Sequence, residues 1–160
     1  MTPRARVICV LVAAVTTAAS FAAAQSKDPF VGTWVLNVAK SKYSPGPVPS
    51  SATTIIEAAG SGYRFSVKQI PATGAALEWS FTTALDGKPA KVAGNNPNAD
   101  MVTYKRIDAT TLESVNTRNG KETTRQRVLV SADGKTRTVT TTGVDGTGQK
   151  INNVAVYEKK

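Results

Sequence analysis

The chain contains no histidine, and its one cysteine is Cys9. Without an imidazole it lacks the commonest general base and the usual protein ligand of zinc and haem iron. Serine triads, cysteine proteases and haem-binding barrels are therefore excluded as they are normally built. We accordingly predict no metal site and no cofactor.

Acidic residues are also scarce, and no two of them suggest a catalytic pair. Two carboxylates can act as acid and base without a histidine, but the acids here occur singly, several of them in predicted turns: Glu57, Glu78, Asp86, Asp100, Asp108, Glu113 and Glu122. No glycine-rich loop lies between a strand and a helix, where such loops bind phosphate. The composition therefore predicts a protein that is not an enzyme.

Long hydrophobic runs are missing except near the N-terminus. Residues 7–19 are apolar and follow Arg4 and Arg6, but this run is shorter than the roughly 20 residues that span a bilayer. Three small residues, 22–24, come next and form the pattern that a signal peptidase cleaves. We predict a cleavable secretory signal at residues 1–24, cut after Ala24, rather than a membrane anchor.

Cleavage would leave residues 25–160 as the mature protein. These 136 residues suit a single domain, whose commonest size is about 100–150 residues. Cys9 leaves with the signal, so the domain must be stable without disulfides. The expected product is soluble, without a transmembrane anchor, in the periplasm or outside the cell; the sequence does not predict its oligomeric state.

Basic residues outnumber acidic ones, and the formal charge of +9 becomes +7 once Arg4 and Arg6 are removed. The densest basic positions, Lys105-Arg106, residues 125–127 and Lys159-Lys160, are scattered along the chain. Scattered charge is typical of a solvated surface. We therefore expect no nucleic-acid partner.

Helical spacing of apolar residues is absent from the mature chain, whereas period-two alternation recurs. Leu77, Trp79 and Phe81, for example, alternate with polar residues. Turn signals such as Asn119-Gly120 separate these runs. We predict strands near residues 31–37, 52–59, 63–70, 76–84, 89–93, 101–107, 110–117, 122–131, 135–143 and 149–158.

Strands in this order form a meander, which has two costly edges unless the first and last strands meet. We predict an all-β fold: a single antiparallel up-and-down β-barrel of about eight to ten strands. A two-sheet sandwich is the rival, although it needs longer crossovers than this chain offers. Of the two long connections, residues 44–49 are proline-rich and predict a stiff extended strap, and residues 94–100 predict a turn.

Motifs at both ends of the mature chain resemble those of the calycin superfamily, the lipocalins and fatty-acid-binding proteins. Gly32-Thr33-Trp34 matches the motif of their first strand, and residues 154–159 resemble the last strand of the fatty-acid-binding branch. A closer resemblance is to exported bacterial lipocalin-like proteins of unestablished activity, on residues 32–37, Lys40-Ser41 and residues 45–47.

The resemblance implies a barrel whose base is formed by Gly32 and Trp34 as structural residues. It also implies an arginine from a late strand stacked on Trp34, for which Arg125, Arg127 and Arg137 are candidates.

The chain departs from the fatty-acid-binding proteins in two places. Their helical lid after the first strand is replaced here by the proline strap. Their Arg-x-Tyr carboxylate motif reads Ala155-Val156-Tyr157, so a carboxylate site cannot be transferred intact. Arg125 or Arg127 could supply the charge from a neighbouring strand, or both could face solvent; the register is not readable from sequence.

If Tyr157 points inward, alternation places Ile151, Asn153 and Ala155 on the same mixed face. Such a face suits either an amphipathic ligand or a filled core. The candidate ligand-binding residues are Tyr157, Asn153, Arg125, Arg127, Tyr104 and Trp79. We predict an exported protein that holds a hydrophobic or amphipathic small molecule in its barrel. The alternative is an envelope interaction module with a filled core, which binds an anionic polymer or a protein through its basic surface.

Overall fold

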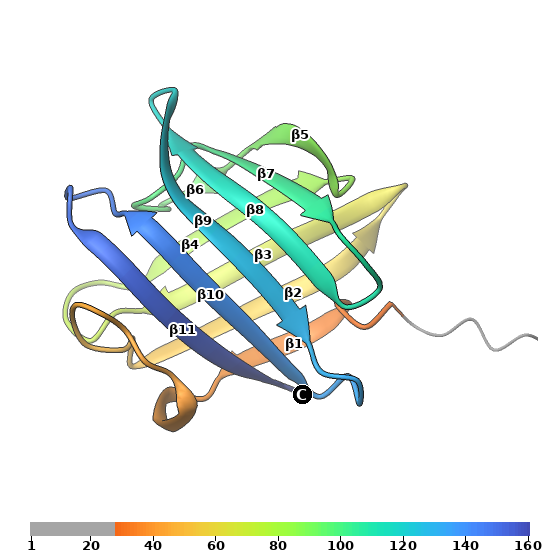
Figure 1. The fold of residues 1–160 in the computed structure, drawn as a ribbon, viewed down its shortest axis with the longest axis horizontal. Coiled ribbons are helices and arrows are strands. Elements are labelled where there is room, and N and C mark those ends of the chain that lie inside the picture. The colour runs from red at the N-terminus through yellow and green to blue at the C-terminus, as the bar shows by residue number, and fades with distance from the viewer. Residues whose placement is uncertain (1–27) are drawn as a thin grey trace, which may run out of the picture.

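The computed structural model describes residues 28–160. They form one antiparallel sheet that curls into a nearly closed barrel (Figure 1). The strands are β1 (Gly32–Leu36), β2 (Ser51–Ala59), β3 (Gly62–Ile70), β4 (Leu77–Thr83), β5 (Asp86–Lys91), β6 (Ala93–Gly94), β7 (Met101–Arg106), β8 (Thr111–Arg118), β9 (Lys121–Val130), β10 (Thr136–Val144) and β11 (Lys150–Lys159). The predicted signal at residues 1–24 lies outside this part of the chain.

The first and last strands meet, as expected, so the meander curls into a nearly closed barrel. β11 pairs with β1, with Leu36 opposite Tyr157. From β7 to β11 and from β1 to β4, each strand pairs with the strand that follows it in the chain. The sheet ends at β5 and β6, which are joined by the buried Val92 alone. The chain itself thus bridges the seam between the two edge strands, and the predicted up-and-down barrel is confirmed.

Predicted and observed strands agree closely. Each observed strand lies within one residue of its predicted ends, except in the region predicted as 89–93, which forms the two short strands β5 and β6. The β8–β9 turn is also as predicted, with positive φ at Asn119 and Gly120. Asp86-Gly87, by contrast, lies inside β5, and the preceding turn holds Leu85 at φ 58°. Leu85 is buried, so packing outweighs its preference for negative φ.

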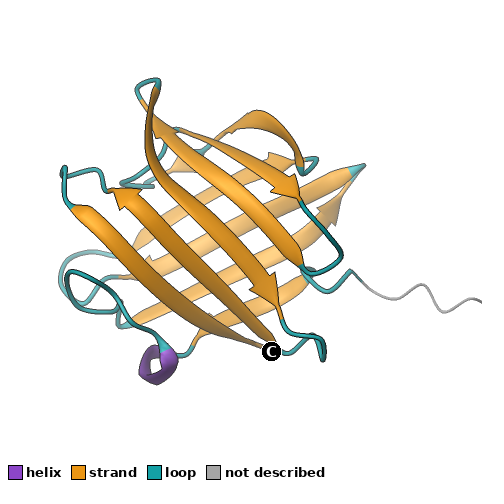
Figure 2. Cartoon of the chain, viewed as in Figure 1, coloured by secondary structure: helices purple, strands orange, loops and turns teal. Residues whose placement is uncertain are grey.

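Helices are nearly absent, and no helical lid covers the barrel within residues 28–160. Figure 2 shows a single short helical turn, the 3-10 segment η1 (Val38–Lys40), whose N-cap Asn37 accepts a bond from the Lys40 amide. Within the same residues, no helix has the length and apolar character needed to cross a membrane.

The proline strap takes the place that a lid would occupy after the first strand. The chain enters the strap along β11: just before it, Lys42 and Val154 form an antiparallel bridge, and at its first residue the Asn152 amide donates to the Ser44 carbonyl at 2.7 Å. This pairing extends the barrel wall beyond the short strand β1.

Alternation along the strands separates the inner and outer faces of the barrel. Inward side chains form one core, which includes Trp34, Ile56, Phe65, Leu112 and Val128. The barrel is not filled completely, and its interior contains the candidate site.

Candidate ligand-binding cavity

A cavity of about 180 Å³ lies inside the barrel. Phe30, Arg137 and Tyr157 line it at one end, which we call the base, where Phe30 and Trp34 are fully buried. Asn98, Thr141 and Ile151 line it at the other end, the mouth, and are partly exposed. Arg137 and Thr141 are four residues apart on β10, which places them roughly 13 Å apart along the strand.

Aromatic rings form one wall of the cavity. Phe65, Phe81 and Tyr104 stack on one another, with ring centroids 4.8 to 5.3 Å apart. Trp79 lies on the same strand as Phe81, nearer the mouth, and also lines the cavity. Sequence alternation places both residues on this inner face.

Polar side chains of β8 and β9 lie next to these rings. Gln126 Oε1 accepts hydrogen bonds from the Tyr104 hydroxyl at 3.1 Å and from the Ser114 hydroxyl at 3.2 Å. Closer to the mouth, Asn116 donates to the Thr124 hydroxyl at 2.8 Å. The cavity is thus lined by aromatic rings and by hydrogen-bonding side chains such as Gln126 and Asn116, an arrangement suited to an amphipathic molecule.

Among residues 28–160, Arg137 is the only charged residue that lines the cavity. Its side chain is buried, with 5% of the residue exposed. The guanidinium lies over the rings of Tyr157, at 4.4 Å from the centroid, and Trp34, at 5.7 Å. Nη2 donates to the Thr54 hydroxyl at 3.1 Å, whereas Nε has no hydrogen-bond partner among the described residues. Among the three candidates, Arg137 is therefore the arginine that stacks on Trp34.

Arg125 and Arg127, named as candidate ligand-binding residues, do not reach the cavity. Their side chains are 65% and 59% exposed on the outer face of β9, where they pair with Glu122 and Glu113, each at 2.6 Å. The even-numbered residues of β9, Gln126 and Val128 among them, face inward instead. Of the two alternatives for these arginines, the structure shows the solvent-facing one.

The other four candidates, Tyr157, Asn153, Tyr104 and Trp79, all line the cavity. Ile151 and Ala155 join Asn153 and Tyr157 on the inner face of β11, as alternation predicts. Asn153 has a second contact, because its Oδ1 accepts the Ser44 amide at 3.0 Å and so ties the strap to β11.

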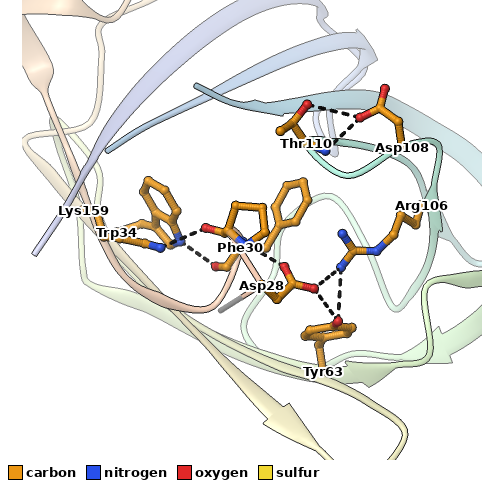
Figure 3. Close-up of polar contacts among 9 residues, drawn as sticks. Asp28, Phe30, Trp34, Tyr63, Arg106, Asp108, Thr110 and Lys159 are labelled. Carbon is orange, nitrogen blue, oxygen red and sulfur yellow. Dashed lines mark hydrogen bonds and ion pairs between the residues drawn. The ribbon is translucent and has the colours of Figure 1, made fainter. Parts of the chain in front are cut away.

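Four side chains at the base form a network that the sequence did not reveal (Figure 3). The Asp28 carboxylate pairs with Arg106 at 2.6 Å and accepts the Tyr63 hydroxyl at 2.5 Å. Arg106 also lies over the ring of Phe30, at 5.0 Å from the centroid. Asp28 and Arg106 are distant in sequence and neither stands in a motif, so no sequence signal links them.

Trp34 and Gly32 complete the base. The Trp34 indole donates a hydrogen bond to the Phe30 carbonyl at 2.8 Å, and Lys159 Nζ lies 4.8 Å from the centroid of the Trp34 ring (Figure 3). Gly32 has a φ of 138°, which L-residues rarely adopt, and a Cβ there would lie 3.1 Å from the Lys159 side chain. At the base, Trp34 is thus contacted by Lys159 as well as by Arg137.

Burial dominates the acid–base properties of the cavity. It raises the pKa of Tyr43, Tyr104 and Tyr157, although Arg137 counteracts this at Tyr157. Burial also lowers the pKa of Arg137, against the influence of Tyr157 and Tyr104. An arginine remains protonated at neutral pH, so the cavity contains a positive charge among neutral phenols.

No group of three or more acidic, histidine or cysteine side chains in residues 28–160 is placed to hold a metal ion. Neither models of known protein families nor curated protein sequences give a match to this chain. The barrel is compatible with a calycin-like fold, and it is at the level of this architecture that the structure supports the resemblance.

Proposed function

We propose that the protein binds a small amphipathic molecule inside its barrel. The observation that carries the proposal is the cavity, which is lined by stacked aromatic rings and by hydrogen-bonding side chains beside them. Cavities of this kind, mostly apolar with a few placed polar groups, are typical of small-molecule sites. Within the part of the chain that the structure describes, its one charged lining residue is an arginine, so we propose binding rather than acid–base catalysis. The calycin resemblance supports the same function.

Titration with the neutral apolar dye N-phenyl-1-naphthylamine tests the proposal. Val139 lines the cavity and its neighbour Thr138 points outward on the same strand, so the two positions give a matched pair. We expect the wild type and Thr138→Trp to bind the dye, and Val139→Trp, which fills the cavity, to lose binding. Equal binding by both variants would place the dye on the outer surface and contradict the proposal.

Salt separates this function from the alternative of a basic surface that binds an anionic polymer or a protein. Ion pairs such as Arg125–Glu122 and Lys68–Glu78 place acids among the exposed basic side chains, which favours the interior as the binding region. Dye binding in the cavity should hardly respond to ionic strength, whereas binding to a charged surface weakens as salt is raised.

We further propose that the protein is exported, on the basis of residues 1–24. The protein recovered from the cell envelope or medium should then begin at Gln25, and its intact mass should lack the first 24 residues. A full-length mass for the protein recovered from the producing cells would contradict export through cleavage.

A further inference from the structure

We propose that the mouth of the cavity recognises a neutral head group with a hydrogen-bond-accepting oxygen, a ketone or an ester, through the side-chain NH2 groups of Asn98 and Asn153. This inference rests on the proposed function, because it assigns the class of amphipathic molecule that the cavity binds. The head would lie at the mouth, with the apolar part of the molecule directed towards the aromatic rings.

Carboxamides are the most numerous polar side chains of the cavity. Among residues 28–160, those that line it are Gln69, Asn96, Asn98, Asn116, Gln126 and Asn153. Asn98 belongs to the loop 95–100 before β7, and Asn153 lies opposite Thr141 in the register of β10 and β11, which places both at the mouth. A carboxamide can donate and accept, so what it offers to a ligand depends on which of its atoms the protein already uses.

Backbone amides fix the orientation of both side chains. Asn98 Oδ1 accepts the Gly146 amide, and Asn153 Oδ1 accepts the Ser44 amide, each at 3.0 Å. Because a backbone N–H can only donate, each oxygen is held by the protein and each NH2 group is left to donate elsewhere. In the described part of the chain, Arg137 Nε is the only sealed side-chain polar atom without a partner, so both NH2 groups remain accessible.

The carbonyl groups of the same loop are already engaged. Arg118 Nη1 donates to the carbonyls of Asn96 and Pro97, at 2.9 and 3.0 Å. The Thr123 hydroxyl donates to the Asn98 carbonyl at 2.6 Å. The loop therefore offers donors to the cavity while its own acceptors are occupied. A ketone or ester oxygen matches this arrangement, whereas the O–H of an alcohol would compete for an acceptor that is already bonded.

Charge argues against an ionic head at the mouth. The one charged lining residue in the described part of the chain is Arg137, which lies at the base. An anion or a protonated amine at the mouth would lose its hydration without gaining a counter-charge, and this loss is costly. A neutral carbonyl group is far cheaper to remove from water. The preferred head is therefore uncharged.

The rest of the cavity selects an apolar body for the ligand. Val139 lies between Arg137 at the base and Thr141 at the mouth on the inner face of β10, and the stacked rings of Phe65 and Phe81 line the same cavity. These surfaces favour an alkyl chain or a ring. The inferred ligand is thus an apolar molecule with a ketone or ester group at its outer end.

2-Nonanone and 2-methyl-1-nonene form a matched probe pair, because the alkene has a CH2 group in place of the carbonyl oxygen. Asn153→Asp keeps the oxygen that accepts the Ser44 amide and replaces the NH2 group by an oxygen that cannot donate. We expect it to weaken binding of 2-nonanone about threefold to tenfold relative to the alkene, as expected for the loss of one neutral hydrogen bond. Asn98→Asp, which keeps the acceptor for Gly146, should act in the same direction. Displacement of N-phenyl-1-naphthylamine measures both affinities.

Asn152→Asp is the matched control. Asn152 precedes Asn153 on β11, but it is exposed and does not line the cavity. The substitution adds the same charge on the outer face of the barrel, so the ratio of the two affinities should stay at its wild-type value.

A second readout requires no variant. In wild-type protein labelled with nitrogen-15, the side-chain NH2 resonances of Asn98 and Asn153 should shift more strongly with 2-nonanone than with the alkene. Equal shifts, or an affinity ratio that survives both Asn98→Asp and Asn153→Asp, would overturn the inference and leave the proposed function intact. Failure of both probes, and of the neutral dye, to bind the wild type would overturn the inference and the proposed function together.

Discussion

Single residues at the base of the barrel join segments that are far apart in sequence. Asp28 accepts three hydrogen bonds, from the Phe30 amide, the Tyr63 hydroxyl and Arg106 Nη2. The carboxylate therefore connects the segment before β1 with β3 and β7. Because the Asp28 and Arg106 side chains are only 23% and 28% exposed, their ion pair is less screened by water than a surface pair.

Replacing this carboxylate should destabilise the protein. Asp28→Asn keeps the shape of the side chain but removes its charge beside Arg106, so we expect the free energy of unfolding to fall by roughly 1–3 kcal/mol. Urea unfolding measures the change. Glu113→Gln is the matched control, because its partner Arg127 is 59% exposed and the pair should contribute little. An equal effect of the two substitutions would contradict the role of Asp28.

The inner position of a residue was predictable where its strand has one apolar face. Alternation placed Trp79 and the β11 residues correctly. It left Arg125 and Arg127 undecided, because β9 has the exposed Leu129 on its outer face and the polar Thr124 and Gln126 on its inner one. The pattern of β10 did not reveal the burial of Arg137 either, because the strand consists largely of threonines and offers little contrast between its faces.

At the scale of elements, β10 shows how a glycine permits close strand contact. Gly143 has a φ of 134°, and a Cβ at this position would lie 2.2 Å from the Thr123 carbonyl oxygen of β9. Gly143 lies near the mouth, in a backbone conformation that other residues rarely adopt. Neither this conformation nor the approach of β9 was predictable from the sequence, because both depend on the register between strands.

Gly143→Ala should therefore be more harmful than the same change in a turn. Gly134 also has a positive φ, 69°, but its added Cβ would meet nothing within 4 Å. We expect Gly134→Ala to cost about 1–2 kcal/mol from its backbone conformation alone, and Gly143→Ala to cost more because the methyl group meets the β9 backbone. Thermal and urea unfolding compare them. A smaller loss for Gly143→Ala would show that the strands separate easily at the mouth.

Strand positions were predictable because turns such as Asn119-Gly120 and period-two runs mark them locally. The closure of the barrel followed from the order of the strands. The split of one expected strand into β5 and β6 did not, since it depends on β5 leaving β4 to pair with β7. Partner choice of this kind is a tertiary effect that local sequence does not encode.

At the scale of the whole molecule, all four tyrosines have raised pKa values. Burial is the main cause for Tyr43, Tyr104 and Tyr157, and the hydrogen bond to Asp28 is the main cause for Tyr63. The folded state therefore favours the neutral phenols. Their contribution to stability is complete below the unfolded pKa of about 10 and is lost as the pH rises through the folded values.

Alkaline titration should reveal this linkage. Phenolate absorbance should stay low as the pH passes about 10, and then rise together with the loss of β-sheet circular dichroism, because ionisation and unfolding are coupled. A protein that titrates its tyrosines near their ordinary pKa while it remains folded would contradict their burial. Free tyrosine in the same buffers provides the reference curve.

The central claim is that the barrel binds a small amphipathic molecule in its interior. Native mass spectrometry of protein isolated without detergent from its own compartment tests this most directly, with Val139→Trp prepared in parallel. We predict a wild-type population that carries one small organic molecule, released on denaturation, and a Val139→Trp protein without it. Wild-type protein that is isolated empty and does not bind N-phenyl-1-naphthylamine would contradict the claim.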